Sequence, residues 1–293
     1  MKILVTGATG QVGRRFVPRL LQHAATAAGG APADTVRVLV RDAARAEPLA
    51  RLGAEAVTGE LRDAGDVAKA LAGVDGVVNI AAAFRGVPDD EAWAVNRDAA
   101  LGLGRAALDA GVTRFVQVST NLVYGAGRGR PAVEDDAPIP GSPMWGAYPE
   151  SKHEAERGLL ALHREEGLDV RVGRLAFVYG EGDPHLAQSM RWAAGWAAHQ
   201  RLQMVHHADV AQGLLRVLYA AGAAGRVFNI ADDAPVTAAE LHRLNGAALP
   251  GGMADRPLPD PWEGVVSTLR IRDELGFRPL YPSVWTARDA GAL

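Results

Sequence analysis

Residues 2–13, which read KILVTGATGQVG, decide the fold. Lys2 to Thr6 is a short apolar, β-branched run typical of a buried strand, and a helical pattern from Gln11 to Ala24 follows it. Glycines at such a junction let the backbone turn tightly and approach a pyrophosphate, whose charge meets the free N–H groups of the helix N-terminus. With a strand before it and a helix after it, the turn is interpreted as dinucleotide-binding rather than as a mere tight connection. The residues predicted to bind the cofactor here are Gly7, Thr9, Gly10, Gln11, Val12 and Gly13.

The rest of the chain alternates short β-branched runs with helical patterns, the arrangement of βαβ units around a parallel sheet. The predicted strands are Lys2 to Thr6, Val36 to Val40, Glu55 to Thr58, Gly76 to Ile80, Arg114 to Ser119, Asp169 to Arg174 and Arg226 to Ala231. The predicted helices are Gln11 to Ala24, Ala43 to Leu52, Asp66 to Leu71, Asp90 to Ala110, Pro149 to Glu166, Ala208 to Ala221 and one after Thr237. Loops rich in Gly and Pro are predicted at Gly29 to Asp34, Gly125 to Pro143 and Pro250 to Pro261.

Beyond Arg174 the regular alternation weakens. We therefore predict an α/β protein in which a doubly wound parallel sheet of the Rossmann type, residues 1–176, binds a dinucleotide. A smaller C-terminal lobe, residues 177–293, is predicted to bind the substrate, with residues 205–232 returning to the first domain.

The composition excludes several classes of protein. The 31 Lys+Arg and 34 Asp+Glu residues give a formal net charge of -3, which disfavours nucleic-acid binding. The absence of Cys excludes disulfides, thiol catalysis and Cys-ligated metal. The most apolar stretch, Val77 to Phe84, is far shorter than the roughly 20 residues of a membrane span, and the start of the chain does not read as a signal peptide. We expect a cytoplasmic protein without a nucleic-acid or membrane partner.

The end of the second predicted strand bears on which dinucleotide is bound. An acidic residue there accepts a hydrogen bond from the adenosine ribose of NAD and repels a 2′-phosphate. Val40 stands where the acid is expected and Arg41 follows it, with Arg37 in the strand and Arg14-Arg15 on the first helix. Guanidinium groups suit phosphate, so NADP is the predicted cofactor. If Arg41 merely pairs with Asp42, NAD remains possible.

The second chemical signal is Tyr148-Pro149-Glu150-Ser151-Lys152. Tyr148 and Lys152 stand four residues apart at a predicted helix start, so both side chains project from one face. A nearby ammonium stabilises phenolate and lowers the pKa of a tyrosine, which makes it usable as an acid or base. Lysine is rare here, with 28 of the 31 basic residues being arginine, so a lysine at this position is suggestive. The alternative is an incidental pair on a surface helix.

Two hydroxyls complete the candidate catalytic set. The strand Arg114 to Ser119 delivers Ser119 and Thr120 to the C-terminal edge of the sheet, where ligands of doubly wound folds bind. A hydroxyl there can share the proton on a substrate oxygen. The catalytic candidates are therefore Thr120, Ser119, Tyr148 and Lys152.

Taken together, these motifs resemble the extended short-chain dehydrogenase/reductase family, which includes NAD-dependent epimerases and dehydratases. The resemblance runs from Met1 to about Leu275, and its motifs occur in the family's order. They are Thr6 to Gly13, Gly59 to Asp63, Ser119 to Gly125, Tyr148 to Lys152, Val178 to Asp183, Val205 to Ala211 and Arg226 to Ile230.

The resemblance implies further cofactor contacts. Asp63 would contact adenine, Glu60 and Leu61 in the same turn would also bind the cofactor, and Ala81 and Ala82 would line it. Asn96 would support the network of the active site at the cofactor.

The resemblance also implies roles in catalysis. Thr120 falls at the position of the family's catalytic Ser or Thr, with Ser119 adjacent. Tyr148 would be the general acid/base, and Lys152 its partner, which also holds the nicotinamide ribose. A homodimer is implied as well, formed by the helices Asp90 to Ala110 and Pro149 to Glu166.

Departures from the family pattern bear on the substrate. Sugar-nucleotide 4,6-dehydratases carry an Asp-Glu pair after the catalytic Thr, because eliminating water needs an extra acid and base, whereas this chain has Asn121-Leu122. Sugar-nucleotide epimerases usually have an Asn where this chain has Phe177, and an Arg where it has Leu202, one residue past Arg201. These differences argue against dehydration and weaken the case for a nucleotide-sugar substrate, although an insertion could restore Arg201.

Other side chains carry weaker signals. Phe84, Trp145, Phe177 and Arg201 are candidates for substrate contact, with packing in the core or an interface as the alternative for the aromatic rings. His206 and His207 are neighbours on a predicted strand and point to opposite faces, so no metal site is predicted. The acidic run Glu134 to Asp136 is interpreted as a solvated loop.

Three functions remain open from the sequence. The leading one is an NAD(P)-dependent oxidoreductase that moves a hydride between a nicotinamide and a ketone or secondary alcohol of a small molecule, with Tyr148 exchanging the proton. An epimerase of a nucleotide sugar, which would keep NAD bound throughout, is the alternative enzyme. A nucleotide-sensing regulator is the third, and the pair Tyr148 and Lys152 argues against it.

Overall fold

The structure, a computed structural model, describes residues 1–26, 33–258 and 260–293. Of the predicted loop Gly29 to Asp34, residues 29–32 lie outside the described residues, and so does residue 259 of the predicted loop Pro250 to Pro261. In the described part of the chain, no helix has the length and apolar character needed to cross a bilayer.

A seven-stranded sheet carries the fold, with strands in the order β10-β6-β5-β4-β1-β2-β3. Its strands are β1 (Lys2–Thr6), β2 (Thr35–Val40), β3 (Glu55–Thr58), β4 (Gly76–Asn79), β5 (Arg114–Thr120), β6 (Val170–Leu175) and β10 (Val227–Ile230). The pairs β1–β2, β1–β4, β2–β3 and β4–β5 are parallel. Because the strand order reverses between β1 and β4, ligands of this kind of sheet bind beyond the carboxyl ends of these two strands.

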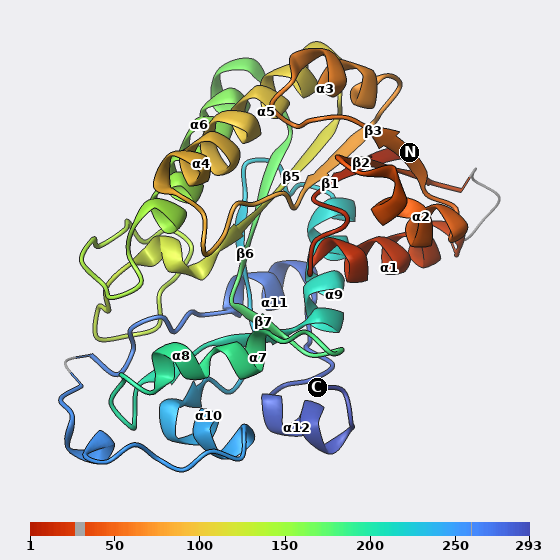
Figure 1. Cartoon of the computed structure of the whole chain (residues 1–293). Helices are drawn as coiled ribbons and strands as arrows, with labels where there is room; N and C mark the ends of the chain where they lie inside the picture. The colour runs from red at the N-terminus through yellow and green to blue at the C-terminus, as the bar shows by residue number, and fades with distance from the viewer. Residues whose placement is uncertain (27–32, 259) are drawn as a thin grey trace. The chain divides into compact units, whose positions relative to one another are not determined.

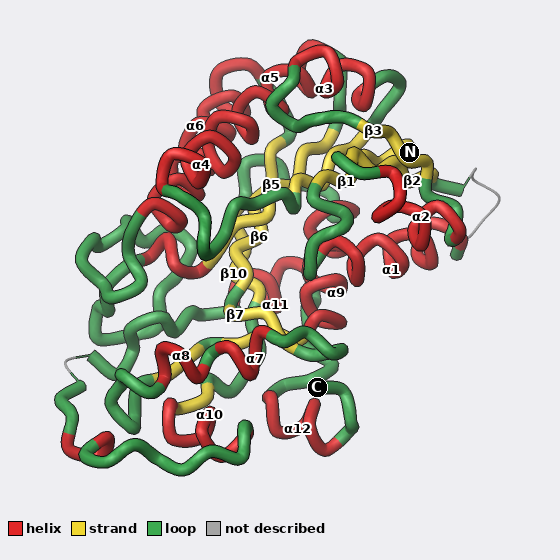
Figure 2. The backbone as a smooth tube through the Cα atoms, viewed as in Figure 1, coloured by secondary structure: helices red, strands yellow, loops and turns green. Residues whose placement is uncertain are grey.

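Helices cover both faces of the sheet, as a doubly wound fold requires. Figures 1 and 2 show α3, α4, α5 and α6 on one face and α1 and α9 on the other. The helices are α1 (Gly13–Ala25), α2 (Ala43–Arg51), α3 (Ala64–Leu71), α4 (Asp89–Trp93), α5 (Ala100–Asp109), α6 (Ala147–Glu166) and α9 (His207–Tyr219). The predicted α/β class and doubly wound sheet are confirmed.

Contacts divide the chain into two compact units. The first comprises Met1–Ser119, Gly146–Gly173 and Gly213–Val227, and the second comprises Thr120–Trp145, Arg174–Gln212 and Phe228–Leu293. Both differ from the predicted ranges 1–176 and 177–293. Residues 120–145 group with the second unit because their partners are there: the Tyr124 hydroxyl donates to Asn229 Oδ1 (2.8 Å), and Asn121 Nδ2 donates to the Gly264 carbonyl (2.9 Å).

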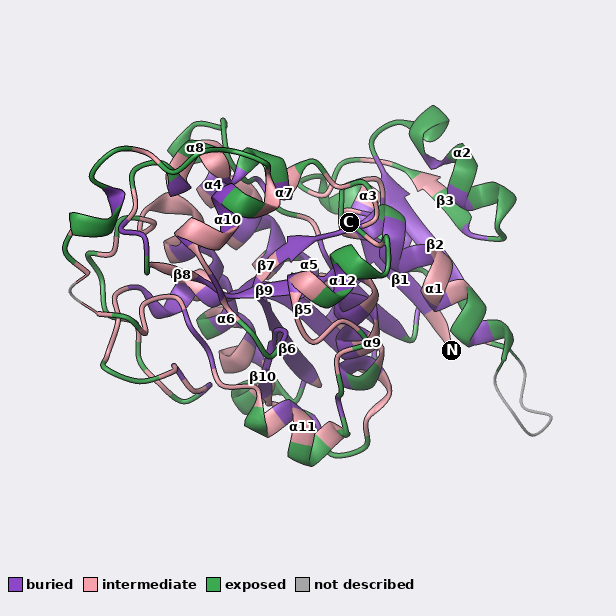
Figure 3. Ribbon diagram, turned by 90° about the horizontal axis from the view of Figure 1, so that it is seen from below, coloured by how far each residue is buried: buried purple, intermediate pink, exposed green. Residues whose placement is uncertain are grey.

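Each unit has its own apolar core. In the first, strand residues such as Leu4, Val77 and Phe115 pack with helix residues such as Leu103 and Leu159, all fully buried. The interior strands of the sheet are correspondingly drawn as buried in Figure 3. The core of the second unit contains Tyr179, Met204, Leu241 and Val284, among others. Burial of these side chains accounts for the near-continuous apolar character of the strands.

The second unit is built from short elements that the sequence did not predict. They are η2 (Asn121–Tyr124), β7 (Phe177–Tyr179), α7 (His185–Gln188), α8 (Met190–Ala193), β8 (Arg201–Leu202), β9 (Met204–His206), β11 (Val236–Thr237), η3 (Met253–Asp255), α11 (Leu269–Leu275) and α12 (Val284–Asp289). Among the described elements that lie wholly within this unit, α10 (Ala238–Leu244) is the one that matches a predicted helix. Strands β8 and β11 pair antiparallel, and β7 and β9 pair parallel.

The prediction that Glu134 to Asp136 form a solvated loop is wrong for two of the three residues. Glu134 is buried, and its Oε1 accepts from the Asn229 N–H at 2.9 Å. Burial raises the pKa of this carboxyl. Asp136 accepts hydrogen bonds from both terminal nitrogens of Arg130, at 2.7 and 2.8 Å. Asn229 lies far away in sequence, which is why a local interpretation of three acidic residues failed.

Candidate active site

The glycine-rich turn joins β1 to α1 at the reversal point of the sheet. Gly7 has a φ of +64°, and a Cβ there would lie 2.6 Å from the Ala81 backbone nitrogen. A Cβ at Gly13 would lie 2.2 Å from the Gly7 carbonyl oxygen. Both glycines are therefore required by close backbone packing. Gly10 and Gln11 are exposed instead, so the turn presents its outer backbone to a ligand at the N-terminus of α1.

The arginines near the turn divide into two groups. Arg37 is buried, and its Nη1 donates to the carbonyls of Ala70 (2.7 Å) and Ala72 (2.8 Å) at the C-terminus of α3. It therefore stabilises a helix end and is not placed as a phosphate ligand, contrary to its interpretation from the sequence. Arg15 is also buried and donates to Gln11.

Arg41 differs from the other arginines of this region. It follows β2, is exposed, and has no hydrogen bond or ion pair with any described residue. Asp42, the partner considered for it, instead caps α2 by accepting from the Ala44 N–H at 2.9 Å. The Arg41 guanidinium therefore remains available at the end of the strand.

The turn after β3 holds three predicted cofactor residues, Glu60, Leu61 and Asp63. Asp63 caps α3, with its Oδ1 accepting from the Asp66 N–H at 2.9 Å, and Asp66 Oδ2 accepts from the Glu60 N–H at 2.9 Å. Glu60 and Asp63 are exposed, while Leu61 packs against the core of the first unit. These contacts fix the turn, and they leave the second carboxylate oxygen of Asp63 for another partner.

Asn96 ties the segment after β4 to the start of α6. This residue is buried within the π-helical turn η1 (Ala94–Ala99), and its Oδ1 accepts from the Ala83 N–H at 2.9 Å. Its Nδ2 donates to the Ala83 carbonyl (2.9 Å) and to Ser151 Oγ (3.2 Å). Ser151 Oγ donates in turn to the Tyr148 carbonyl at 3.0 Å. The backbone that holds Tyr148 is thus fixed to the strand end that carries Ala81 and Ala82.

Tyr148 lies in the first turn of α6 and is half-buried. The ring of Phe84, a predicted substrate residue, packs against it with 4.4 Å between the ring centroids and 46° between the planes. Phe84 is 36% exposed, and the Arg85 guanidinium lies 4.3 Å from its ring centroid. Phe84 therefore covers Tyr148 while keeping part of its own ring in contact with solvent.

Lys152 lies one turn further along α6 and is buried. Its Nζ donates to the Val118 carbonyl near the end of β5 at 2.8 Å. Burial lowers the pKa of Lys152 to about 8, against a smaller opposing effect of the Glu156 carboxylate. One bond to Val118 leaves two N–H protons of the ammonium for a ligand or for Tyr148.

The two candidate hydroxyls have different surroundings. Thr120 Oγ1 accepts from the Leu122 N–H at 3.2 Å and so caps the short helix η2. Ser119 Oγ is buried and has no hydrogen-bond partner among the described residues. An orphaned hydroxyl of this kind is costly unless a ligand satisfies it. Ser119 belongs to the same unit as Tyr148 and Lys152, whereas Thr120 is the first residue of the second unit.

The other predicted substrate residues lie in the second unit. The Phe177 ring stacks on His185, with 3.9 Å between centroids and 18° between planes. The Trp145 ring lies against Gly125, where a Cβ would approach it to 3.1 Å. The Arg201 guanidinium lies 5.0 Å from the centroid of Trp262.

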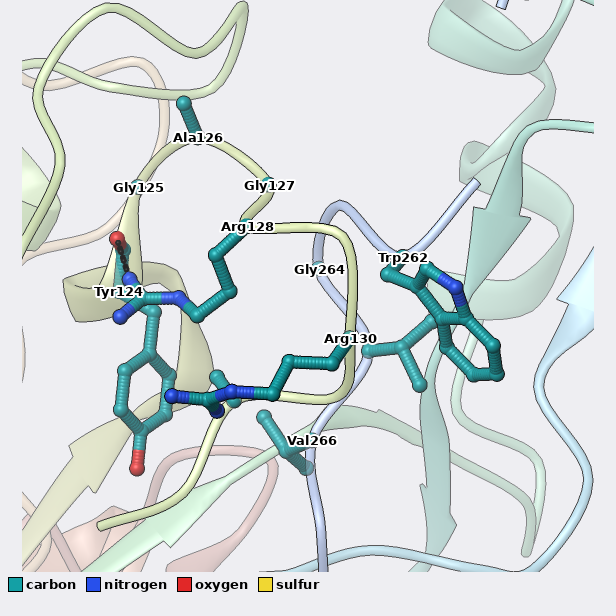
Figure 4. A pocket seen from close by; sticks show the side chains of 11 residues that line it. Tyr124, Gly125, Ala126, Gly127, Arg128, Arg130, Trp262, Gly264 and Val266 are labelled. Atoms are coloured by element: carbon teal, nitrogen blue, oxygen red, sulfur yellow. Dashed lines mark hydrogen bonds between the residues drawn. The ribbon is translucent and has the colours of Figure 1, made fainter. Parts of the chain in front are cut away.

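Trp262 is also part of the wall of a pocket in the second unit (Figure 4). The pocket has about 210 Å³ of empty volume, in part open to solvent, and runs between the segments 124–132 and 262–266. Figure 4 shows Arg128 and Arg130 on one side and Trp262 on the other. The pocket thus combines cationic and aromatic groups, with Arg201 stacked on one of its walls. In the described part of the chain, no cluster of three or more His, Cys, Asp and Glu side chains could hold a metal ion.

The residues of the first unit fit a nicotinamide dinucleotide. A narrow glycine turn opens α1, an exposed arginine follows β2, and a buried serine hydroxyl lacks a partner among the described residues. Three polar residues were not predicted from the sequence: Ser151, which links Asn96 to Tyr148, and two buried amides, Asn79 at the end of β4 and Gln117 in the middle of β5. A polar side chain within an otherwise apolar strand was the available signal for the two amides.

Comparisons with known proteins agree with this geometry. The NAD dependent epimerase/dehydratase family matches residues 3–231. A 4-hydroxy-2-methyl-3-oxo-4-farnesyl-3,4-dihydroquinoline-1-oxide ketoreductase of Stigmatella aurantiaca is 30% identical over 248 residues, covering 80% of this chain and 70% of the relative. A dTDP-glucose 4,6-dehydratase of Streptomyces griseus is 33% identical over 307 residues, covering 94% of this chain and 89% of the relative. The crystal structure of a dTDP-glucose 4,6-dehydratase from Streptomyces venezuelae with NAD bound superimposes with a TM-score of 0.77 at 28% identity, covering 99% and 97% of the two chains.

Proposed function

The chain belongs to the NAD dependent epimerase/dehydratase family of short-chain dehydrogenases/reductases, and on this premise we propose that it is an NADP-dependent ketoreductase of a small molecule. A bound nicotinamide would supply or accept a hydride at the carbon of a ketone or secondary alcohol. The protein must then bind the dinucleotide, orient the carbonyl and move one proton to or from its oxygen.

The observation that carries the proposal is the arrangement of Tyr148 and Lys152. They lie one turn apart on α6, Lys152 is held by the Val118 carbonyl at 2.8 Å, and Ser151 and Asn96 fix the backbone at Tyr148. In reduction, the Tyr148 hydroxyl gives its proton to the carbonyl oxygen as the carbon receives the hydride, and the ammonium of Lys152 stabilises the resulting phenolate. Ser119 or Thr120 donates a hydrogen bond that orients the carbonyl oxygen.

The segment after Thr120 favours reduction over dehydration. The two positions that hold an Asp-Glu pair in sugar-nucleotide dehydratases are Asn121 and Leu122 here. The Asn121 carboxamide donates to the Gly264 carbonyl at 2.9 Å, and Leu122 has no ionisable group. Neither side chain can exchange a proton as an eliminating enzyme requires. The ketoreductase relative supports the same direction.

The preference for NADP rests on Arg41. Its exposed guanidinium follows β2, it has no partner among the described residues, and the carboxylate that could neutralise it is occupied in capping α2. A 2′-phosphate at the end of β2 would give that guanidinium a charged partner.

The decisive experiment is the Tyr148→Phe substitution, followed by NADPH oxidation with a panel of ketones. The substitution keeps the ring against Phe84 and removes the transferable proton, so turnover should fall by roughly 10²- to 10⁴-fold while NADPH still binds. Tyr219→Phe is the matched control, because the Tyr219 hydroxyl bonds to Asp34 in the same unit and takes no part in the proposed chemistry. Near-normal turnover of the Tyr148→Phe enzyme would refute the proposal.

A second measurement separates a reductase from an epimerase. A reductase must release its oxidised cofactor in every cycle, whereas an epimerase re-reduces the same carbon with a retained cofactor. Purified protein that still carries a full equivalent of NAD after extensive desalting, and converts no ketone with added NADPH, would favour the epimerase.

A further inference from the structure

Three buried polar side chains form a row across β1, β4 and β5: Thr6 and Asn79 end their strands, and Gln117 lies in the middle of its strand. The parallel register pairs Thr6 of β1 with Asn79 of β4, and Asn79 with Gln117 of β5. Side chains paired in this way lie on the same face of the sheet. Each of the three is 1% exposed, so the row lies in the interior of the first unit.

The hydrogen bonds of the row are continuous. Thr6 Oγ1 donates to Asn79 Oδ1 at 2.5 Å, and Asn79 Nδ2 donates to Gln117 Oε1 at 2.8 Å. Gln117 Nε2 donates to the Val118 carbonyl at 2.9 Å. At the other end, the Ala81 N–H approaches Thr6 Oγ1 at 3.4 Å.

The backbone groups at the two ends of the row fix which side-chain atoms donate and which accept. The Val118 carbonyl can only accept, so Gln117 must turn its NH₂ toward it and its oxygen toward Asn79. Asn79 must then turn its NH₂ toward Gln117 and its oxygen toward the Thr6 hydroxyl, from which it accepts a hydrogen bond. The Ala81 N–H can only donate, so it meets a lone pair of the same hydroxyl oxygen. Reversing any one amide would place two donors or two acceptors against each other, which is costly in a buried site.

The row ends on the oxygen that holds the proposed catalytic lysine. The Val118 carbonyl accepts from Gln117 Nε2 at 2.9 Å and from Lys152 Nζ at 2.8 Å, which fills both of its lone pairs. The position of the ammonium therefore depends on which of the two lone pairs Gln117 occupies. Gln117 also brings the positive end of its amide dipole to the same oxygen as the ammonium, which adds to the cost of the charge on Lys152.

We propose that Gln117 is a positioning residue for Lys152, and that the row Thr6–Asn79–Gln117 couples the dinucleotide turn to this lysine. The inference rests on the proposed function for the role of Lys152 in turnover, but the position of the lysine is measured independently of it. Thr6 directly precedes Gly7, and Ala81 packs against Gly7. The backbone segments at Gly7 and at Ala81 are thus both connected to the row. A shift of either segment changes the hydrogen bonds that the Val118 carbonyl accepts.

The test uses the scarcity of lysine. Lys2, Lys69 and Lys152 are the lysines of the chain, so protein labelled with ¹⁵N-lysine gives three Nζ signals, and the Lys152→Arg variant assigns the signal of interest. Gln117→Met keeps the length of the side chain and removes both of its hydrogen bonds. In the cofactor-free protein this variant should raise the pKa of Lys152 from its value of about 8, because the amide dipole beside the ammonium is gone. Among the described titratable groups, the Glu156 carboxylate is the one acting on Lys152, and it is unchanged in the variant.

The kinetic prediction separates positioning from general stability. Gln117→Met should lower kcat by roughly 2- to 10-fold, the factor of one net hydrogen bond, with the KM of the ketone unchanged. Gln203→Met is the matched control, because Gln203 is equally buried and donates to Asp232 in the second unit. It should leave both kcat and the Lys152 signal as they are. An unchanged Lys152 titration in Gln117→Met, or an equal loss of kcat in Gln203→Met, would overturn the inference.

A second variant keeps the test decisive if Gln117→Met does not fold. Thr6→Val has almost the same shape and breaks the row at its far end, two hydrogen-bond links from Gln117. A shifted Lys152 Nζ signal in this variant would support coupling along the row, and an unshifted one would refute it. If Tyr148→Phe retains turnover, the proposed function fails, but the Nζ titration still decides the role of Gln117, since it needs neither cofactor nor substrate.

Discussion

Replacing Lys152 by methionine should make the protein more stable at pH 7 while removing its activity. The structure buries this ammonium and lowers its pKa from 10.5 to about 8. A pKa difference of that size means that the charged lysine lowers the free energy of unfolding by about 3 kcal/mol relative to a neutral one. Lys152→Met removes this cost, and Val118 keeps its hydrogen bond from Gln117. The attraction of Glu156 is already contained in the pKa of about 8. Loss of the hydrogen bond from Lys152 Nζ to the Val118 carbonyl offsets about 1 kcal/mol, so the net gain should be about 2 kcal/mol.

The gain should depend on pH with a defined sign. Between pH 8 and pH 10.5 the unfolded chain binds a proton at Lys152 that the folded protein does not, so the wild type becomes more stable as pH rises through this window. The advantage of Lys152→Met should therefore be complete below pH 8 and nearly vanish at pH 10.5. Denaturant titrations of both proteins at pH 7 and pH 10 measure the difference directly, and a melting-temperature increase of roughly 4 °C is expected at pH 7. A variant that is less stable than wild type at both pH values would show that burial of the ammonium is not costly here.

Three further outcomes are expected. Arg41→Ala should weaken NADPH binding by about tenfold and leave NADH binding unchanged, as measured by calorimetry; equal affinity of the wild type for the two cofactors would contradict the role given to Arg41. Thr120→Val and Ser119→Ala should each reduce kcat less than Tyr148→Phe does, because losing one orienting hydrogen bond costs less than losing the transferred proton; a loss as large as that of Tyr148→Phe would contradict this difference. Sedimentation at micromolar concentration should give twice the 30.8 kDa mass of the chain, since the family resemblance implies a homodimer; a species of 30.8 kDa alone would refute it.

The sequence predicted the sheet well because its strands are encoded locally. Each predicted strand of the central sheet is observed within a residue of its expected ends; β1, for example, spans Lys2–Thr6 as predicted. Apolar β-branched runs bounded by turns leave little freedom in a sheet buried on both faces. The short strands and helices of the second unit escaped prediction, since two- to four-residue elements such as β8 (Arg201–Leu202) carry no periodicity.

Site residues were predictable where the chemistry is local and not where it depends on distant partners. The spacing of Tyr148 and Lys152 on one helix is observed, with α6 beginning two residues earlier than predicted, at Ala147. Arg37 was misinterpreted because its acceptors, the carbonyls of Ala70 and Ala72, lie more than thirty positions along the chain. No local sequence pattern indicates which distant helix end will lie beside a residue of a strand.

The π-helical turn η1 lies between α4 and α5 in one continuous helical segment. It changes the direction around the helix axis in which the side chains after it point, relative to those before it. In a regular α-helix, Asn96 and Leu103, seven residues apart, would lie within about 20° of each other on one side. In the structure, Asn96 bonds to Ala83 and Ser151 while Leu103 packs into the core, and the wider turn between them supplies the rotation that separates these directions. Deleting a single residue between Asn96 and Leu103 would leave them six positions apart, which is about 600° of rotation in a regular α-helix and therefore about 120° between the two side chains. Such a deletion would convert the wide turn to an α-turn and keep the two side chains on different sides. The loss of one residue should therefore be tolerated better at this turn than in the regular helices on either side, where it rotates every later side chain by about 100°.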